Sequence, residues 1–369
     1  MLKRTINIVA VTLLIFNATM PIMSQIDKEI RFTCVENELF GVLTLPNAKK
    51  PYPAIILLHG SDRGVADNYK QYANELIRSG FAVLTYDSPG KGKSTGSTVG
   101  ETFEYRYQEA ISAINYLQSR QDIKPDGIGL WGISQGGWIC QMAAATSDNV
   151  AFIIPVSGPG VTVPEQEIFR VKAQSEAAGF SKNDVEQAVL IRRLLVDLVL
   201  SEPQYVKKNK KDAKNLGSGP WNELINLAYS KDALDPKNEM KIFIEVLREI
   251  KDENWSKYLM IEYILSMLEN IEPDAWESIK KSFELTMKFD PANYLTKIHV
   301  PVLAIFGDAD TSVPVKESIK IYKQALKKAK NKDVTIKVFP NTDHGINVEG
   351  KPAPGFYSTM IDWLINLKL

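Results

Sequence analysis

Hydrophobic residues are arranged in two patterns along the chain, and each pattern predicts a kind of strand. From about residue 29 to 45, IRFTCV and LFGVLTL alternate apolar and polar positions around the polar turn at 36–38. This predicts an antiparallel hairpin at one edge of a sheet. Later apolar runs are continuous, which is typical of parallel strands buried on both faces. These runs are AIILL (54–58), FAVLTY (81–86), IGLWG (128–132) and FIIPV (152–156).

Segments with helical spacing separate these runs, from about 66 to 79, 101 to 120 and 135 to 145. Alternation of strands and helices predicts a doubly wound, mostly parallel α/β sheet. In such sheets the ligand site lies at the carboxyl ends of the strands.

The alternation stops near residue 164 and resumes at the strand PVLAIFG, 301–307. A helix around 316–328, a strand at 334–339 and a last helix near 355–366 are expected after it. The interval is rich in Leu, Ile, Glu and Lys at helical spacing. We therefore predict one core, built from 25–163 and 291–369, with a helical cap or lid inserted at 164–290. Aromatic residues at helical spacing in this insertion are expected to fill its core rather than to line a pocket.

The N-terminus begins with Lys3 and Arg4, and an apolar stretch follows from Ile6 to Phe16. This pattern predicts a signal peptide over 1–24 and export to the periplasm or the medium. An uncleaved membrane anchor is the alternative, because the apolar run nearly reaches spanning length. The cleavage position stays open.

Charge and cysteine content narrow the classes of partner. The chain of 369 residues carries 44 Lys+Arg and 44 Asp+Glu, a formal net charge of zero, and only two cysteines. This balance leaves no basic footprint for nucleic acid or for an acidic membrane. No metal-ligand spacing is evident, so we expect no metal and no organic cofactor. A small-molecule substrate in a pocket is expected, and the oligomeric state is left open.

The strongest chemical motif is Gly132-Ile133-Ser134-Gln135-Gly136, which follows a predicted strand and precedes a predicted helix. A nucleophilic serine in such a strand-to-helix turn needs small neighbours, and Gly132, Gly136 and Gly137 supply the room. The helix start presents free N–H groups to developing negative charge. Ser134 is therefore the candidate nucleophile, and the backbone N–H of Gln135 is the candidate first oxyanion donor.

A serine nucleophile needs a base, and the chain has three histidines. His299 stands at the amino end of a strand, and His59, before a glycine, fits a loop-shaping role. His344 follows the last predicted strand and is the preferred base. The acid that orients it is expected in the loop after 301–307, where Asp310 is preferred to Asp308 because its side chain can reach back toward the histidine loop.

The turn His59-Gly60-Ser61-Asp62 follows the strand AIILL. Its position predicts the second half of an oxyanion hole, with the Ser61 backbone N–H as the favoured donor and that of Asp62 as the alternative.

Four motifs together resemble the α/β-hydrolase family, including capped serine esterases and their prolyl-oligopeptidase-like and acyl-thioesterase-like relatives. They are HGS (59–61), YDSPGKGKS (86–94), GISQGG (132–137) and the paired GDAD (307–310) and DHG (343–345) loops. The second is similar to the family's D-x-R-G-x-G-x-S, but Pro89 replaces the arginine. The resemblance therefore implies only a supporting role for Asp87.

The resemblance implies cleavage of a carboxylic ester or related acyl bond through an acyl-enzyme on Ser134. Peptide, thioester and lactone hydrolysis use the same triad and stay open as alternatives. A catalytically silent ligand-binding relative is the alternative from another class.

Overall fold

The computed structural model describes residues 25–99, 101–200, 236–272 and 275–369. The predicted signal peptide, 1–24, lies outside the described residues. Within these ranges, no helix combines the length and the apolar character needed to cross a bilayer.

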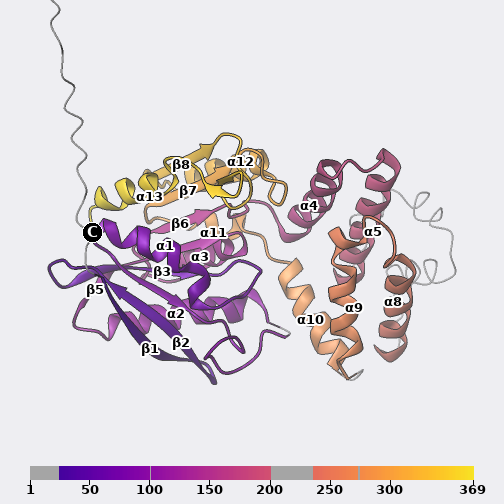
Figure 1. Cartoon of the computed structure of the whole chain (residues 1–369), viewed down its shortest axis with the longest axis horizontal. Helices are drawn as coiled ribbons and strands as arrows, with labels where there is room; N and C mark the ends of the chain where they lie inside the picture. The colour runs from indigo at the N-terminus through magenta and orange to yellow at the C-terminus, as the bar shows by residue number, and fades with distance from the viewer. Residues whose placement is uncertain (1–24, 100, 201–235, 273–274) are drawn as a thin grey trace, which may run out of the picture.

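An eight-stranded sheet, in the order β1-β2-β4-β3-β5-β6-β7-β8, forms the centre of the α/β unit (Figure 1). The first two strands form the expected hairpin at the edge, and β2 also pairs antiparallel with β4. Every other neighbouring pair in this sheet is parallel. The strands are β1 (Ile26–Cys34), β2 (Asn37–Leu45), β3 (Tyr52–Leu58), β4 (Ala82–Tyr86), β5 (Ile123–Ile133), β6 (Ile153–Val156), β7 (Val302–Gly307) and β8 (Val334–Phe339).

Helices cover both faces of the sheet, as the alternating pattern predicted. The helices α2 (Phe103–Gln118), α3 (Gln135–Thr146) and α12 (Val315–Lys328) pack on one face, and α1 (Lys70–Leu76) and α13 (Phe356–Ile365) pack on the other. Short 3-10 turns at Ala66–Tyr69 and Ile77–Ser79 flank α1, and a small hairpin, β9 (Asn347–Val348) and β10 (Lys351–Pro352), precedes α13. The predicted α/β-hydrolase fold is confirmed.

Strand β5 begins five residues earlier than the apolar run at 128–132 indicated. Residues 124–126 read Lys-Pro-Asp, and the pairing with β3 shifts register between Tyr52 and Ala54. Polar side chains and an irregular register hide this part of the strand from a search for hydrophobic periodicity.

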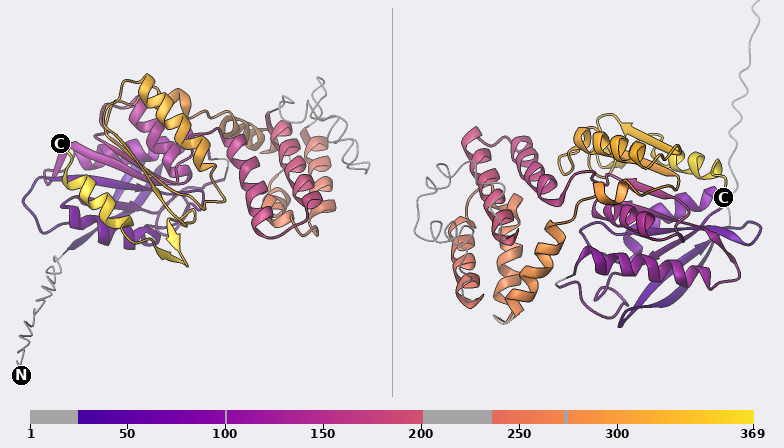
Figure 2. Two further views of the ribbon diagram at one scale, coloured as in Figure 1. Left: turned by 90° about the horizontal axis from the view of Figure 1, so that it is seen from above. Right: turned by 180° about the vertical axis from the view of Figure 1, so that it is seen from behind.

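The segment between β6 and β7 forms a helical unit beside the sheet (Figures 1 and 2). Its described helices are α4 (Val163–Ala177), α5 (Lys182–Leu200), α8 (Pro236–Ile250), α9 (Ile261–Glu269) and α10 (Trp276–Met287), with a 3-10 turn at Ser256–Leu259. These helices enclose their own hydrophobic core, which includes Val246, Leu247, Trp255 and Trp276. Helix α4 starts with a capping box between Thr162 and Glu165, six residues after β6 ends.

In both figures α4 and α10 are the helices of this unit that lie nearest the sheet. From α10 the chain returns through the short helix α11 (Ala292–Leu295) to β7.

Candidate active site

Ser134 lies at the end of β5, in the sharp turn that leads into α3. Its backbone has φ 54° and ψ −122°, an unfavourable region for a residue with a side chain. The turn is anchored where the Ser134 N–H donates to the Val156 carbonyl at 2.9 Å. The residue as a whole remains partly exposed in this strained turn.

Neighbouring backbone atoms fill the space beside Gly132 and Gly136, so neither position has room for a side chain. A Cβ on Gly136 would lie 2.7 Å from the carbonyl oxygens of both Leu58 and His59. A Cβ on Gly132 would collide with the Gly136 carbonyl, and one on Gly137 would collide with Gly158. The turn therefore packs directly against the loop that follows β3.

His344 and Asp310 are joined by a hydrogen bond between Nδ1 and Oδ2 at 2.8 Å. The other carboxylate oxygen accepts the N–H groups of Ser312 and Val313, at 2.6 and 3.0 Å. The Asp310 side chain is fully buried, whereas that of His344 is 28% exposed. A carboxylate fixed in this way holds the proton on Nδ1, which leaves the Nε2 lone pair of His344 free to accept a proton.

Asp308, the carboxylate passed over in the same loop, is directed elsewhere. Its Oδ1 accepts the Asn341 N–H at 2.6 Å, and the residue is exposed. Asp308 thus ties together the two loops that follow β7 and β8 without contacting the imidazole.

Ser157, directly after β6, joins the loop that carries His344 to the sheet. The Ser157 N–H donates to Ile305 of β7 at 2.7 Å, and its Oγ donates to the His344 carbonyl at 2.8 Å. In the part of the chain that the structure describes, the Ser134 Oγ makes no hydrogen bond to a neighbour. Proton transfer between Ser134 and His344 therefore stays a prediction, and contacts of this kind often tighten only when substrate binds.

The two predicted oxyanion donors lie at facing loops. Ser61 is exposed after β3, and the preceding Gly60 N–H donates to the Tyr69 hydroxyl at 3.2 Å. Gln135 is the first residue of α3. Neither amide donates a hydrogen bond to another described residue, and their role as oxyanion donors stays a prediction.

The other two histidines have environments unsuited to a base. The Nε2 of His59 donates to the Tyr86 carbonyl at 2.6 Å, and burial lowers the pKa of His59 to about 4. His299 is exposed just before β7, at its amino end.

Asp87 supports the loop after β4. Its two carboxylate oxygens accept the N–H groups of Ala66 and Lys93, each at 2.7 Å. These contacts connect the loop at 87–94 to the 3-10 turn that precedes α1.

The sequence analysis missed a buried charged network on α2. Arg106 donates to the side chain of Gln135 and to the carbonyls of His59 and Gly60. Beside it, Arg63 pairs with Glu101 and Glu109 at 2.6 and 2.5 Å.

Burial raises the pKa of Glu109 to about 7, although Arg63 lies against it. Arg106 and Glu109 lie on the same helix face as the buried residues Phe103, Ala110 and Ala113. Charged residues on an otherwise apolar helix face were the sequence signal that could have revealed this network.

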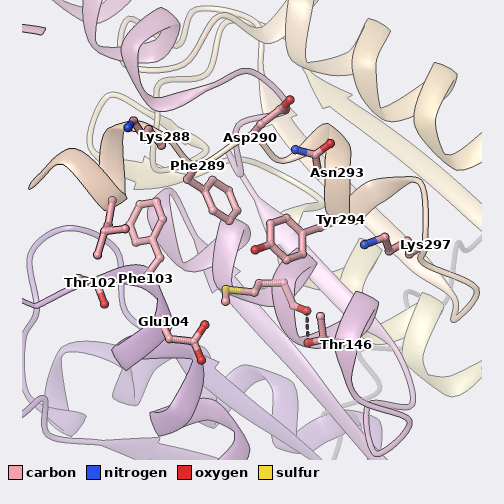
Figure 3. Close-up of a pocket in the computed structure, with 12 residues that line it drawn as sticks. Thr102, Phe103, Glu104, Thr146, Lys288, Phe289, Asp290, Asn293, Tyr294 and Lys297 are labelled. Carbon is pink, nitrogen blue, oxygen red and sulfur yellow. Dashed lines mark hydrogen bonds between the residues drawn. The ribbon is translucent and has the colours of Figure 1, made fainter. Parts of the chain in front are cut away.

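A separate cavity of about 490 Å³ lies along α3, between α2 and the α10–α11 connection (Figure 3). Phe103, Phe289 and Tyr294 point into it. Phe103, Trp138 and Phe289 contact one another, with centroids 5.1 to 5.8 Å apart. The residues that line the cavity do not include Ser134, Asp310 or His344.

Cys34 and Cys140 are buried free thiols. Among the described residues, no group of three or more His, Cys, Asp or Glu side chains is placed to hold a metal ion.

The sequence matches the family model described as X-Pro dipeptidyl-peptidase (S15 family) over residues 38–345. An uncharacterized 31.7 kDa protein from the traX-finO intergenic region of Escherichia coli is 24% identical over 280 residues, or 75% of this chain and 79% of that protein. The putative hydrolase YtaP of Bacillus subtilis (strain 168) is 32% identical over 123 residues, which cover 27% of this chain and 41% of that protein. Acyl-coenzyme A thioesterase 1 of Homo sapiens is 32% identical over 121 residues, 32% of this chain and 26% of the thioesterase. The chain thus spans less than half the length of the last two relatives.

Two solved structures share the fold. A Pyrococcus furiosus esterase superposes with a TM-score of 0.53 at 14% identity, covering 92% of this chain and 89% of that one. The alpha/beta hydrolase GrgF from Penicillium sp. sh18 gives 0.53 at 18% identity, with coverages of 92% and 97%.

Proposed function

Because the chain belongs to the X-Pro dipeptidyl-peptidase (S15) family and is a hydrolase of the α/β-hydrolase fold, we propose that it cleaves a carboxylic ester or related acyl bond. Ser134 is the nucleophile, His344 the general base and Asp310 the acid that orients it. The observation that carries the proposal is the hydrogen bond between His344 and the buried Asp310, formed by loops at the same edge of the sheet as the strained Ser134 turn.

The reaction proceeds in two acyl transfers. His344 Nε2 takes the proton of Ser134 as the oxygen attacks the carbonyl carbon, and the N–H groups of Ser61 and Gln135 stabilise the oxyanion. The protonated histidine gives that proton to the leaving group as the acyl-enzyme forms. Water, deprotonated by His344, then attacks the acyl carbon, and the acid product leaves as Ser134 regains its proton.

The helical unit acts as a cap over this site in our proposal. Two glutamines of α4 reach the loop that carries Asp310, with Gln166 donating to the Ser312 carbonyl at 2.6 Å and Gln174 to the Ser312 hydroxyl at 3.2 Å. The cap therefore contacts the same loop that carries Asp310, the acid of the proposed triad. A small acyl substrate bound between cap and sheet is the expected partner.

The proposal also includes export directed by residues 1–24. Cell fractionation of the full chain and of a form lacking these residues tests this step. Equal distribution of the two forms between compartments contradicts it.

The central test is Ser134→Ala, with Ser147→Ala at the other end of α3 as the matched control. Ser134→Ala is expected to lose nearly all turnover of short nitrophenyl esters and all labelling by a fluorophosphonate probe, while keeping its circular dichroism spectrum. Ser147→Ala is expected to keep both the ester turnover and the labelling by the probe. Full activity in folded Ser134→Ala rejects the assignment of the nucleophile. No labelling and no turnover in the wild-type protein favours the silent ligand-binding alternative.

The family match favours one second candidate, a peptidase that acts on Xaa-Pro substrates. All of these reactions require the same triad, so variants of the triad cannot distinguish them. A panel of nitrophenyl acyl esters, acyl-coenzyme A thioesters and Xaa-Pro nitroanilides can. The ester proposal expects the highest kcat/KM on an ester. A higher value on the thioester or the nitroanilide replaces it with that reaction.

A further inference from the structure

We propose that Arg106 is the positioning residue that holds both halves of the oxyanion hole, an inference that rests on the function proposed above. Its guanidinium lies where the loop after β3 meets the start of α3. No other described side chain donates hydrogen bonds to both of these segments.

The guanidinium reaches three neutral acceptors. Nη1 donates to the side-chain oxygen of Gln135 at 2.8 Å, and Nη2 donates to the carbonyls of His59 and Gly60, at 2.5 and 3.0 Å. The planar fork of an arginine fixes the direction of such bonds better than the single ammonium of a lysine. One side chain therefore links two loops that are remote in sequence.

The bond to Gly60 determines where the neighbouring amide points. The carbonyl of Gly60 and the N–H of Ser61 belong to one planar trans peptide unit, in which they point in opposite directions. When Arg106 holds the Gly60 carbonyl, the Ser61 N–H is directed away from Arg106. The amide predicted to bind the oxyanion is thereby fixed without contacting Arg106 itself.

The second donor is fixed from the α3 side. Gln135 supplies the other N–H, and its side chain is held by Arg106. The two segments also meet at Gly136, where a Cβ would lie 2.7 Å from the Leu58 and His59 carbonyls. Because the two segments are packed this closely, a small shift of one after loss of the guanidinium is transmitted to the other.

The charge of Arg106 has no direct acidic partner among the described residues. Glu101 and Glu109 both pair with Arg63 instead. Burial, with a smaller contribution from Arg63, lowers the pKa of Arg106 to about 10, which still leaves a cation at neutral pH. A buried cation is costly unless hydrogen bonds compensate it. Arg106 directs three to the two loops of the proposed site, and its Nε has no partner among the described residues.

The test compares Arg106→Met and Arg106→Lys with Arg120→Met, a matched control just beyond the other end of α2. Arg120 binds Asp122 at 2.8 Å and touches neither loop. Loss of one oxyanion donor lowers kcat by about 10²–10³ in other serine hydrolases. We expect Arg106→Met to lose at least tenfold in kcat per folded molecule with KM changed less than threefold, and Arg120→Met to keep kcat.

Arg106→Lys keeps the charge, but its single nitrogen cannot lie at the positions of both Nη1 and Nη2. Its kcat is therefore expected to fall at least tenfold too. This variant carries the test if Arg106→Met does not fold. In Arg106→Ala, added ethylguanidinium is expected to restore part of kcat, whereas a purely structural role predicts no such rescue.

The outcomes distinguish this inference from the proposed function. Normal kcat in folded Arg106→Lys or Arg106→Met, with Ser134→Ala inactive, overturns the role of Arg106 and leaves the triad standing. Activity in Ser134→Ala overturns the proposed function itself. A fall in kcat equal to that of Arg120→Met also rejects the positioning role.

Discussion

Replacing Asp310 by Asn tests the pairing on which the catalytic proposal depends. The new side chain has nearly the same shape, so its amide oxygen can still accept the Ser312 and Val313 N–H groups in place of Oδ1. Its amide nitrogen, however, stands where Oδ2 now accepts the His344 Nδ1–H at 2.8 Å. An amide donor there favours the tautomer protonated on Nε2, which cannot take the proton of Ser134.

The magnitude follows from this loss of tautomer. A comparable substitution in a serine protease lowers kcat by about 10⁴. We expect a fall of about 10³–10⁴, equivalent to about 4–5.5 kcal/mol of transition-state stabilisation at about 1.36 kcal/mol per tenfold. Two of the three hydrogen bonds to the carboxylate persist, so the free energy of unfolding should fall by only about 1–3 kcal/mol.

The assay measures kcat for a short nitrophenyl ester across pH 5–9, with the folded fraction measured by circular dichroism. Asp308→Asn is the matched control from the same loop, because the new amide oxygen could still accept the Asn341 N–H. That variant should keep kcat within about threefold, since near-isosteric surface changes have small effects. Asp310→Asn with more than a tenth of wild-type kcat, or an equal loss in Asp308→Asn, refutes the reasoning.

Three further changes probe the parts of the structure around the site. Ser157→Ala removes the hydrogen bond to the His344 carbonyl. If that bond contributes about 0.5–1.5 kcal/mol, kcat should fall about two- to tenfold at unchanged KM. An unchanged kcat excludes a contribution of this bond to catalysis. Leu247→Ala empties a fully buried position in the helical core, so urea unfolding should show a loss of about 2–5 kcal/mol, and a loss below about 1 kcal/mol argues against independent packing there. Glu109 has its pKa raised by burial from the usual 4.5 to about 7, so the stability it contributes is full below its ordinary pKa and is lost as pH rises through about 7. Glu109→Gln should therefore flatten the fall of unfolding free energy between pH 5 and 7.5, and an unaltered slope contradicts the shift.

Local patterns in the sequence were sufficient to predict the fold class and most of its strands. Continuous apolar runs separated by helical spacing predicted the buried parallel strands, and the alternating segment at 29–45 predicted the antiparallel edge hairpin. Both patterns reflect which faces of a strand or helix are buried, and the spacing of apolar residues along the sequence reveals those faces. The glycines around Ser134 were informative for the same reason, because the steric demands of a tight turn are local.

Other features depended on which side chains meet in space. The sequence placed two carboxylates in one loop and favoured Asp310, but only the fold shows that Asp310 contacts His344 and that Asp308 contacts Asn341. Nor does periodicity reveal that Arg106, on α2, bonds to the loop after β3 and to Gln135 of α3. Hydrogen bonds and ion pairs are directional and short-ranged, so they are decided only when the sheet and helices have brought remote segments together.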